Sequence, residues 1–376
     1  MSSLARPWLR AATTASAARF AASTTAPPAI LAVAPFTASL RHISTGPPRL
    51  RPATVVSPSV DASAKPASPG TAISSATPST SKLGLVTCDP TNDHILPFFH
   101  APTFTWTYLV LDSSRTRAVV IDPALDYDAA SGHISSASLQ PLVGLIRDRG
   151  YQVTHILETH VHADHLTGAR RLKTLLAQQQ AAPPVIGIGA GVTKVQRQFA
   201  TRYGLDDAAL ADSFDLLLES DATLAFGQST CRVMHLPGHT PDHVGYMIDD
   251  CLFAGDSIFM PDVGTARADF PGGSATQLAQ SLTTLLELPD DTKVFVGHDY
   301  PPPQTGRPEM TCSTVAEQRQ RNIHSPHLDG FVELRTHRDA GLAAPRLLHP
   351  SLQFNLVGGR LLRNHFVIPV QADWAA

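Results

Sequence analysis

Cysteine is scarce in this sequence, and no two cysteines stand close together. The 376 residues include four cysteines, with no C-x-x-C pair among them: Cys88, Cys231, Cys251 and Cys312. A disulfide framework or a cysteine-based zinc knuckle needs thiols at short, regular spacings, so neither is indicated. Thiols that stay reduced fit an enzyme of a reducing compartment.

Long apolar runs and a strong net charge are also missing. Beyond the N-terminal region, no segment reaches the ~18 uninterrupted apolar residues of a membrane span. The formal net charge is −3, whereas binding to nucleic-acid phosphates calls for a basic face on the folded domain. We therefore expect neither a membrane span nor a nucleic-acid partner.

Acidic residues are absent from the start of the chain, where the first one is Asp61. The same region is rich in Ala, Ser and Thr and carries six arginines: Arg6, Arg10, Arg19, Arg41, Arg49 and Arg51. This composition is typical of an organelle transit peptide, and the arginines interrupt every run that could form the apolar core of a secretory signal. The sequence thus predicts a mitochondrial transit peptide over residues 1–45 and a location in the mitochondrial matrix.

Large apolar residues are also few between positions 46 and 82, where Pro, Ser, Ala and Thr dominate. Such a segment cannot bury enough apolar surface to fold, so we expect a disordered linker. The remaining residues, 83–376, are enough for one large hydrophobic core and predict a single catalytic domain. Its proline-interrupted C-terminal extension, residues 322–376, is expected to be either a strap over a sheet edge or a contact in a homodimer.

Histidine and aspartate, in contrast, are concentrated in one short segment. Thr159-His-Val-His-Ala-Asp-His places three imidazoles and a carboxylate between His160 and His165. If the apolar run just before this segment is a strand, the side chains of His160 and His162 point to one side. Asp164 and His165 follow where the chain turns into a helix, so they can face the same cavity. This density of ligand-type residues predicts a metal site.

Further ligand-type residues follow short strand-like runs. His239 stands in Pro-Gly-His-Thr, Asp256 in Gly-Asp and His298 in Gly-His-Asp-Tyr, and Asp122 also follows such a run. Strand ends share one rim of a sheet, which is where α/β proteins place their chemistry. The other histidines, including His243, lack such a neighbourhood and are expected to be surface or packing residues.

Helical patterns alternate with these strand-like runs along much of the chain. Apolar residues recur at helical spacing in residues 140–149, 167–179, 192–203 and 274–286. The alternation predicts a mixed α/β fold.

The order His-x-His-x-Asp-His, Pro-Gly-His-Thr, Gly-Asp, Gly-His-Asp-Tyr resembles the metallo-β-lactamase superfamily over nearly the whole chain after about residue 85. Membership implies a four-layer αββα sandwich with a metal at one edge of its two sheets. The superfamily hosts several chemistries, so the fold alone does not identify the reaction.

Finer features resemble the persulfide dioxygenases of the ethylmalonic-encephalopathy-protein type. These features are residues 159–168, the Gly-Thr-Ala-Arg-Ala-Asp-Phe loop at 264–270, and Gly-His-Asp-Tyr at 297–300. The loop at 262–273 and the C-terminal tail are closer still to the bacterial β-lactamase-like hydrolase branch of that group. The resemblance implies that glutathione persulfide, O2 and water give glutathione and sulfite at a single Fe(II).

The same resemblance implies a role for ten residues. The catalytic iron ligands would be His160, His239 and Asp256, a facial triad of the kind that non-haem iron oxygenases use. The residues that orient these ligands would be His162, Asp164, His165 and His298. Contacts with the glutathione part would come from Arg267, Tyr300 and Arg319, because guanidinium and phenol groups suit its carboxylates and backbone.

Two other readings stay open from the sequence. In a glyoxalase-II-like thiolester hydrolase with two Zn ions, the same seven metal-site residues would hold both ions and Asp256 would bridge them. No lysine-rich glutathione-binding helical domain of the glyoxalase type follows His298, which favours the dioxygenase. The last reading, a non-catalytic module that binds metal or sulfur, is disfavoured because none of the seven residues is missing.

Overall fold

The computed structural model of the chain describes residues 93–362, except for the side chains of residues 326–328. The predicted transit peptide, residues 1–45, and the predicted linker, residues 46–82, lie outside the described residues. Within the described part, no helix has both the length and the apolar character to cross a membrane.

Two six-stranded sheets form the centre of the fold. The first sheet has the strand order β1-β2-β3-β6-β8-β9 and comprises Ile95–His100, Thr105–Leu111, Arg117–Ile121, Gln152–Glu158, Val185–Gly189 and Leu216–Leu218. The second sheet runs from β10 to β15 in sequence order and comprises Thr223–Phe226, Ser229–His235, Val244–Ile248, Cys251–Phe253, Lys293–Phe295 and Cys312–Thr314. A small third sheet, β5-β4-β7, joins His133–Ser135, Ala124–Asp128 and Leu166–Thr167.

Helices cover the outer faces of both sheets. They are α1 (Gln140–Arg149), α2 (Ala169–Leu176), α3 (Val192–Tyr203), α4 (Asp207–Leu210), α5 (Ala275–Leu286), α6 (Val315–Arg321), α7 (Phe331–Asp339) and α8 (Leu348–Asn355), with 3-10 turns at Ala137–Leu139 and Ser325–Gly330. Helix α1 begins with a proline in its first turn and ends at Gly150, whose φ of 69° only glycine adopts readily. Helix α6 begins with a capping box between Thr314 and Glu317.

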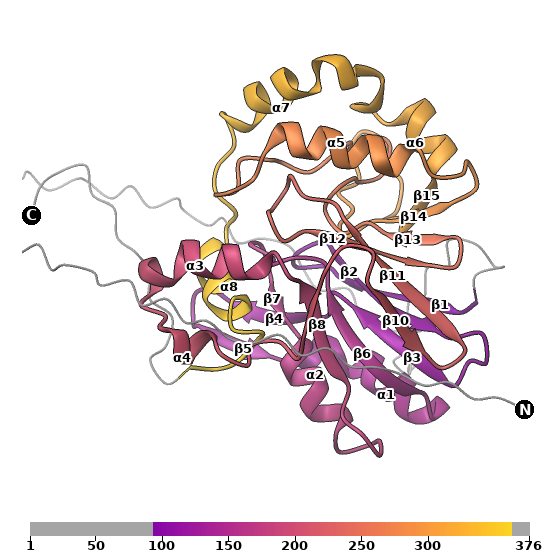
Figure 1. Cartoon of the computed structure of the whole chain (residues 1–376), viewed down its shortest axis with the longest axis vertical. Coiled ribbons are helices and arrows are strands. Elements are labelled where there is room, and N and C mark those ends of the chain that lie inside the picture. Colours follow the sequence, from indigo (N-terminus) through magenta and orange to yellow (C-terminus); the bar gives the residue numbers. More distant parts are fainter. Residues whose placement is uncertain (1–92, 363–376) are drawn as a thin grey trace, which may run out of the picture. The chain divides into compact units, whose positions relative to one another are not determined.

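The hydrophobic core lies in three layers between these elements. Apolar side chains of the two sheets meet in the middle layer, which includes Trp106 and Phe253. The outer face of the first sheet packs on α1 and α2, and that of the second sheet packs on α5, α6 and α7. Figure 1 shows this order, with α1 and α2 on one side of the sheets and α5 to α7 on the other. The αββα sandwich predicted from the sequence is confirmed.

Two buried tyrosines bond across the sheets near the strand ends. The hydroxyl of Tyr108, on β2, donates to the carbonyl of Val296 at 2.7 Å, just after β14. The hydroxyl of Tyr246, on β12, donates to the carbonyl of Glu158 at 2.7 Å, at the end of β6. Both acceptors come just before predicted metal-site residues, so these bonds hold the two sheets in a defined position beneath the site.

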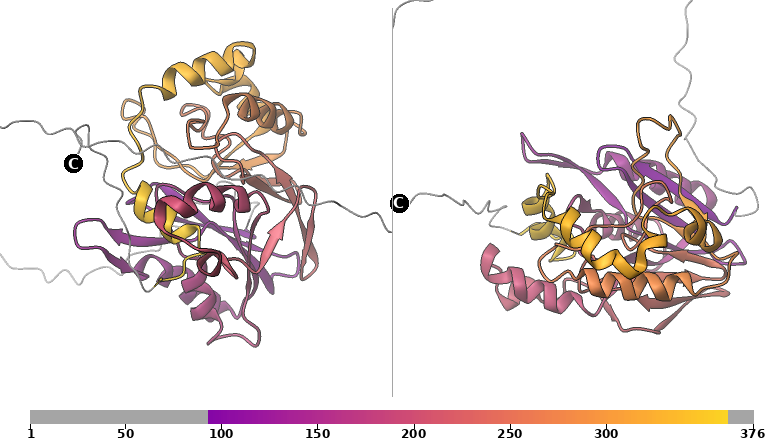
Figure 2. Two further views of the ribbon diagram at one scale, coloured as in Figure 1. Left: turned by 60° about the vertical axis from the view of Figure 1, so that its left-hand side comes forward. Right: turned by 90° about the horizontal axis from the view of Figure 1, so that it is seen from above.

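The C-terminal extension crosses from the second sheet to the first. Phe331 of α7 is buried in the core under α5, whereas Leu352 and Leu356, in and just after α8, pack against α3. Figures 1 and 2 both show α8 beside α3 and apart from α7.

Candidate metal centre

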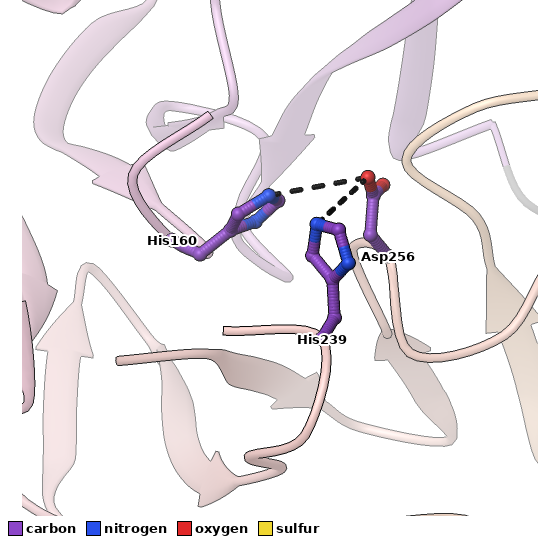
Figure 3. Close-up of side chains that lie close together, drawn as sticks. All are labelled: His160, His239 and Asp256. Atoms are coloured by element: carbon purple, nitrogen blue, oxygen red, sulfur yellow. Dashed lines mark ion pairs between the residues drawn. The ribbon is translucent and has the colours of Figure 1, made fainter. Parts of the chain in front are cut away.

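Three predicted ligands meet at the edge where the two sheets open. His160 follows β6, His239 follows β11 and Asp256 follows β13, and Figure 3 shows all three side chains turned toward one another. Oδ2 of Asp256 lies 3.9 Å from Nε2 of His160 and 3.8 Å from Nε2 of His239. One ion with bonds of about 2.0–2.2 Å can bridge atoms up to roughly 4.4 Å apart. This arrangement therefore suits a single cation.

Hydrogen bonds orient both imidazoles so that Nε2 faces the centre. Nδ1 of His239 lies 2.7 Å from the carbonyl oxygen of Arg267, to which it must donate. Nδ1 of His160 lies 3.0 Å from the hydroxyl of Thr159, whose proton goes to Asp122 at 2.8 Å. Burial, with the neighbouring histidines, holds the pKa of His160 well below its usual value, so its imidazole is neutral and can bind a metal.

Close backbone packing allows Asp256 to reach the centre. The amide of Asp256 donates to Nε2 of His243 at 3.0 Å, and His243 itself is fully buried with its ring 4.9 Å from that of His160. A Cβ on Gly255 would lie 2.7 Å from the Thr159 hydroxyl oxygen. A Cβ on Gly297 would lie 2.6 Å from Oδ1 of Asp256.

The other four predicted residues form a second group beside the first. Oδ2 of Asp164 lies 3.2 Å from Nε2 of His298, and its Oδ1 lies 3.3 Å from Nδ1 of His165. Nε2 of His298 is also 3.5 Å from Oδ1 of Asp256, which joins the two groups. Burial lowers the pKa of His165 to about 4. For His298, burial also lowers the pKa, but the carboxylates of Asp256 and Asp164 raise it above its usual value overall.

His162 is held differently from the other histidines. Its Nε2 lies 3.1 Å from Oδ1 of Asp122 and 3.2 Å from Oε2 of Glu158, and all three residues are buried. Burial alone would lower the pKa of His162, but the two carboxylates raise it well above its usual value. An imidazole held by carboxylates on one nitrogen is a common arrangement behind a metal ligand.

Several buried polar atoms in this region have no hydrogen-bond partner among the described residues. They are Nε2 of His160, Nδ1 of His162, Nε2 of His165 and Oδ1 of Asp256. Leaving a buried polar atom unpaired costs about 1–3 kcal/mol. The potential ligand atoms of His160, His239 and Asp256 all lie within 4.8 Å of one another, as do those of His162, Asp164 and His165. The residues present therefore fit one or two metal ions.

The comparisons with known proteins agree with this geometry. The profile of the metallo-beta-lactamase superfamily matches residues 100–298. The chain belongs to this superfamily.

Several superfamily members are similar over most of the folded region. A probable metallo-hydrolase of Burkholderia pseudomallei is 42% identical over 279 residues, which cover 70% of this chain and 92% of the relative. Glyoxylase B2 of Dictyostelium discoideum is 42% identical over 263 residues, which cover 68% of this chain and 88% of the relative. The mitochondrial persulfide dioxygenase ETHE1 of Homo sapiens is 29% identical over 227 residues, which cover 60% of this chain and 72% of the relative.

Among solved structures, ETHE1 from Myxococcus xanthus is similar, with a TM-score of 0.55 and 26% identity. The match covers 71% of this chain and 99% of the M. xanthus chain. The superfamily resemblance found in the sequence is therefore confirmed, and the residues suit a metal-dependent enzyme.

The predicted glutathione contacts lie in different surroundings. Tyr300 stacks on His298 with ring centroids 5.5 Å apart, and it is 41% exposed at the rim of the centre. The Arg267 guanidinium binds both carboxylate oxygens of Asp269 at 2.6 Å, while its backbone carbonyl orients His239. Arg319 donates to the carbonyls of Leu286, the last residue of α5, and of Leu288, just beyond it. Of the three, the structure brings the Tyr300 ring and the Arg267 backbone to the cluster.

Sequence reasoning did not assign five further residues that hold the centre together: Asp122, Glu158, Asp242, His243 and Asn355. The sequence did contain a sign that Asp122 belongs to the site, because this residue follows a strand as the other ligand-type residues do. Asp242, which accepts from the amide of Val161 at 2.8 Å, lies three residues past His239 and shares its segment. His243 is a buried packing residue, as expected, but what it packs against was not foreseen: β12 begins one residue later and its ring lies beside that of His160. Nothing local in the sequence marks Asn355.

Proposed function

We propose that this chain is a persulfide dioxygenase that converts glutathione persulfide, O2 and water to sulfite and glutathione at one Fe(II). The observation that carries the proposal is the cluster of two imidazoles and one carboxylate, with Nε2 of His160 and Nε2 of His239 each within 3.9 Å of Asp256. Two histidines and one carboxylate on one face leave other coordination positions open, as non-haem iron oxygenases require. The similarity to the human and M. xanthus ETHE1 proteins supports the same reading.

Bound Fe(II) would supply the electron transfer between persulfide sulfur and O2 that side chains alone cannot perform. The protein itself supplies orientation and charge. The Thr159 hydroxyl and the Arg267 carbonyl fix the ring planes of His160 and His239. Nε2 of His298 lies between Asp164 and Asp256, whose carboxylates raise the pKa of this imidazole, so its protonated form would present a positive group to an anionic substrate or product. The ring of Tyr300 covers one face of His298.

A binuclear thiolester hydrolase with two Zn ions is the second candidate. The cluster of His162, Asp164 and His165 favours it, because their potential ligand atoms also lie within 4.8 Å of one another. The relatives at 42% identity carry the names metallo-hydrolase and glyoxylase, which fits hydrolysis. Nε2 of His162 is already engaged by Asp122 and Glu158, which leaves its unpaired Nδ1 as the atom that would bind the second ion.

Metal content and oxygen uptake distinguish these candidates. Protein purified without oxygen is expected to hold one iron per chain and to consume O2 with glutathione persulfide. His239→Ala should abolish both iron retention and turnover, whereas His298→Ala should keep most of the iron. His337→Ala, at an exposed position on α7, serves as the control and should change neither.

Three outcomes would contradict the proposal. Equal loss of metal in both variants, or two zinc ions per chain with rapid hydrolysis of S-lactoylglutathione, would favour the hydrolase. Full metal loading without O2 uptake on any persulfide would favour the non-catalytic module.

We also propose that the protein acts in the mitochondrial matrix, because residues 1–45 have the composition of a transit peptide. Fusing these residues to a fluorescent protein tests this separately from the chemistry. Matrix import of the fusion is expected, and a cytosolic signal would contradict the assignment.

A further inference from the structure

The last residue of α8 lies directly beneath the metal-binding loop. Asn355 is 3% exposed, and its amide nitrogen donates to the carbonyls of His162 and His165, both at 2.8 Å. Its amide oxygen accepts from the backbone N–H of Thr167 at 2.9 Å. One buried side chain thus holds three backbone groups of residues 160–167, which we call the histidine loop.

These three bonds occupy both donors and one acceptor position of the amide. The carbonyls that they hold belong to His162 and His165, so the bonds act on the turn that carries four predicted metal-site residues. A shift of this turn would move Nδ1 of His162 and Nε2 of His165, two of the buried atoms without a hydrogen-bond partner.

A second contact fixes the end of the same loop. The hydroxyl of Thr167 donates to Glu158, whose other carboxylate oxygen faces Nε2 of His162. The amide of Ala169 donates to the Thr167 hydroxyl at 3.0 Å, which joins the loop to the start of α2. A buried polar network runs from Asn355 through Thr167 and Glu158 to His162.

Packing holds Asn355 in place from the opposite side. The neighbouring Leu352 and Leu356 are buried against α3, and the side chain of Gln196 on α3 donates to the carbonyl of Leu356 at 2.8 Å. The chain then turns at Gly358, where a Cβ would lie 2.0 Å from the carbonyl oxygen of Ser213. Asn355 is therefore placed by α8 as a rigid element.

We propose that Asn355 is a positioning residue of the metal centre, and that the three hydrogen bonds of its amide set the geometry with which the histidine loop binds metal. The amide acts through the backbone of His162, His165 and Thr167 and touches neither metal nor substrate. The inference goes beyond the proposed reaction, because the histidine loop must be held in the same way for iron or zinc and for one ion or two.

The test is Asn355→Asp, which keeps the size of the side chain and the acceptor for Thr167. It replaces the two donors by an oxygen that faces two carbonyl oxygens. Affinity for Co(II), measured by competition with a chelator, should fall about 10–100-fold, as it does when groups behind metal ligands are removed. The absorption spectrum of bound Co(II) should change, and the metal-induced rise in the thermal midpoint should shrink.

Two control variants separate positioning from general loosening of α8. Ser351→Ala alters an equally buried residue of the same helix, whose hydroxyl has no hydrogen-bond partner among the described residues. Gln196→Met removes the bond to Leu356 without touching the histidine loop. Both should leave the Co(II) spectrum and affinity unchanged, even where the midpoint of the metal-free protein falls.

A parallel fall of the metal-free and metal-loaded midpoints in Asn355→Asp, with unchanged Co(II) affinity and spectrum, would overturn the proposal. Hydrogen exchange of the unaltered protein provides a measurement that no folding defect can obscure. The Thr167 amide should exchange slowly even without metal, because Asn355 already binds it. Free exchange of that amide in the metal-free protein would also refute the proposal.

Discussion

The first sheet delivers its candidate ligands on one short loop, whereas the second sheet delivers each from a separate loop. Beside the first sheet, the histidine loop is held by buried polar side chains from several elements: Asp122 and Glu158 at ends of first-sheet strands, Asp242 just before β12 and Asn355 on α8. On the second sheet, the ligands depend on backbone contacts and on adjacent glycines such as Gly255 and Gly297. A dense loop needs side chains to orient it, while a single ligand at a strand end needs space for its backbone. The two halves should therefore fail in different ways.

The largest effect is expected from a change on the second sheet. In Gly297→Ala, the new Cβ would lie 2.6 Å from Oδ1 of Asp256 and displace that carboxylate. We expect at least about a 100-fold loss of metal affinity, together with loss of turnover. The metal content that remains after dialysis measures the loss of affinity.

The matched control is Gly330→Ala, where a Cβ would meet nothing within 4 Å. It should change stability by no more than about 0.5 kcal/mol and leave metal binding intact. Normal metal content in Gly297→Ala would show that Asp256 does not need this close approach.

A smaller effect is expected from the first sheet. Asp122→Asn keeps the side-chain shape and suits the φ of 48° at this position, but it removes the charge that faces His162. Metal affinity should fall about 10–100-fold, because the Thr159 and His162 contacts weaken together. Titration calorimetry with Zn(II) or Co(II) measures the change. Unaltered affinity would mean that hydrogen bonding without charge is enough to orient the loop.

The smallest effect on the metal is expected at Asp112, which follows β2 as Asp122 follows β3. Its carboxylate accepts from the amides of Thr116, Arg117 and Gln228 at 2.9–3.0 Å, far from any predicted ligand in the sequence. Asp112→Asn should lower the free energy of unfolding by about 1–3 kcal/mol and leave metal affinity unchanged. A change in metal affinity would mean that the two strand-end aspartates are not independent.

The same residue predicts a pH dependence. Burial would raise the pKa of Asp112, but the hydrogen bonds from Ser114 and the backbone amides hold it well below its usual value. A carboxyl whose pKa is lower in the folded state adds stability above its unfolded pKa of about 3.9, and this stability is lost as the pH falls below that value. Acid unfolding of Asp112→Asn should therefore depend less steeply on pH below about 4 than that of the unaltered protein.

Much of the fold could be predicted from local sequence. The helical patterns at 140–149 and 192–203 match α1 and α3, and the pattern at 274–286 matches α5 to within one residue. The pattern at 167–179 was too long, because Leu166 and Thr167 pair with β4 and α2 begins only at Ala169. Apolar periodicity reports burial, but it does not tell which backbone partner a terminal residue finds.

The candidate site was predictable where its residues are close in sequence or follow strands. The histidine loop met that condition, and so did the Gly-His and Gly-Asp segments. The contact of Asn355 with His162 spans 193 residues, which no local pattern encodes. The partners of Arg319 were equally hard to predict, since only the fold brings the carbonyls of Leu286 and Leu288 to its guanidinium. The roles of Arg267, Tyr300 and Arg319 in glutathione binding stay predictions.

The distance along the chain between the histidine loop and α8 also has a consequence for synthesis. A ribosome makes His162 long before Asn355, which comes 193 residues later. Until that late segment emerges and folds back, the turn at His162 and His165 lacks its two amide donors. The histidines are therefore among the earlier parts of the domain to be made, but their scaffold is among the last to be completed.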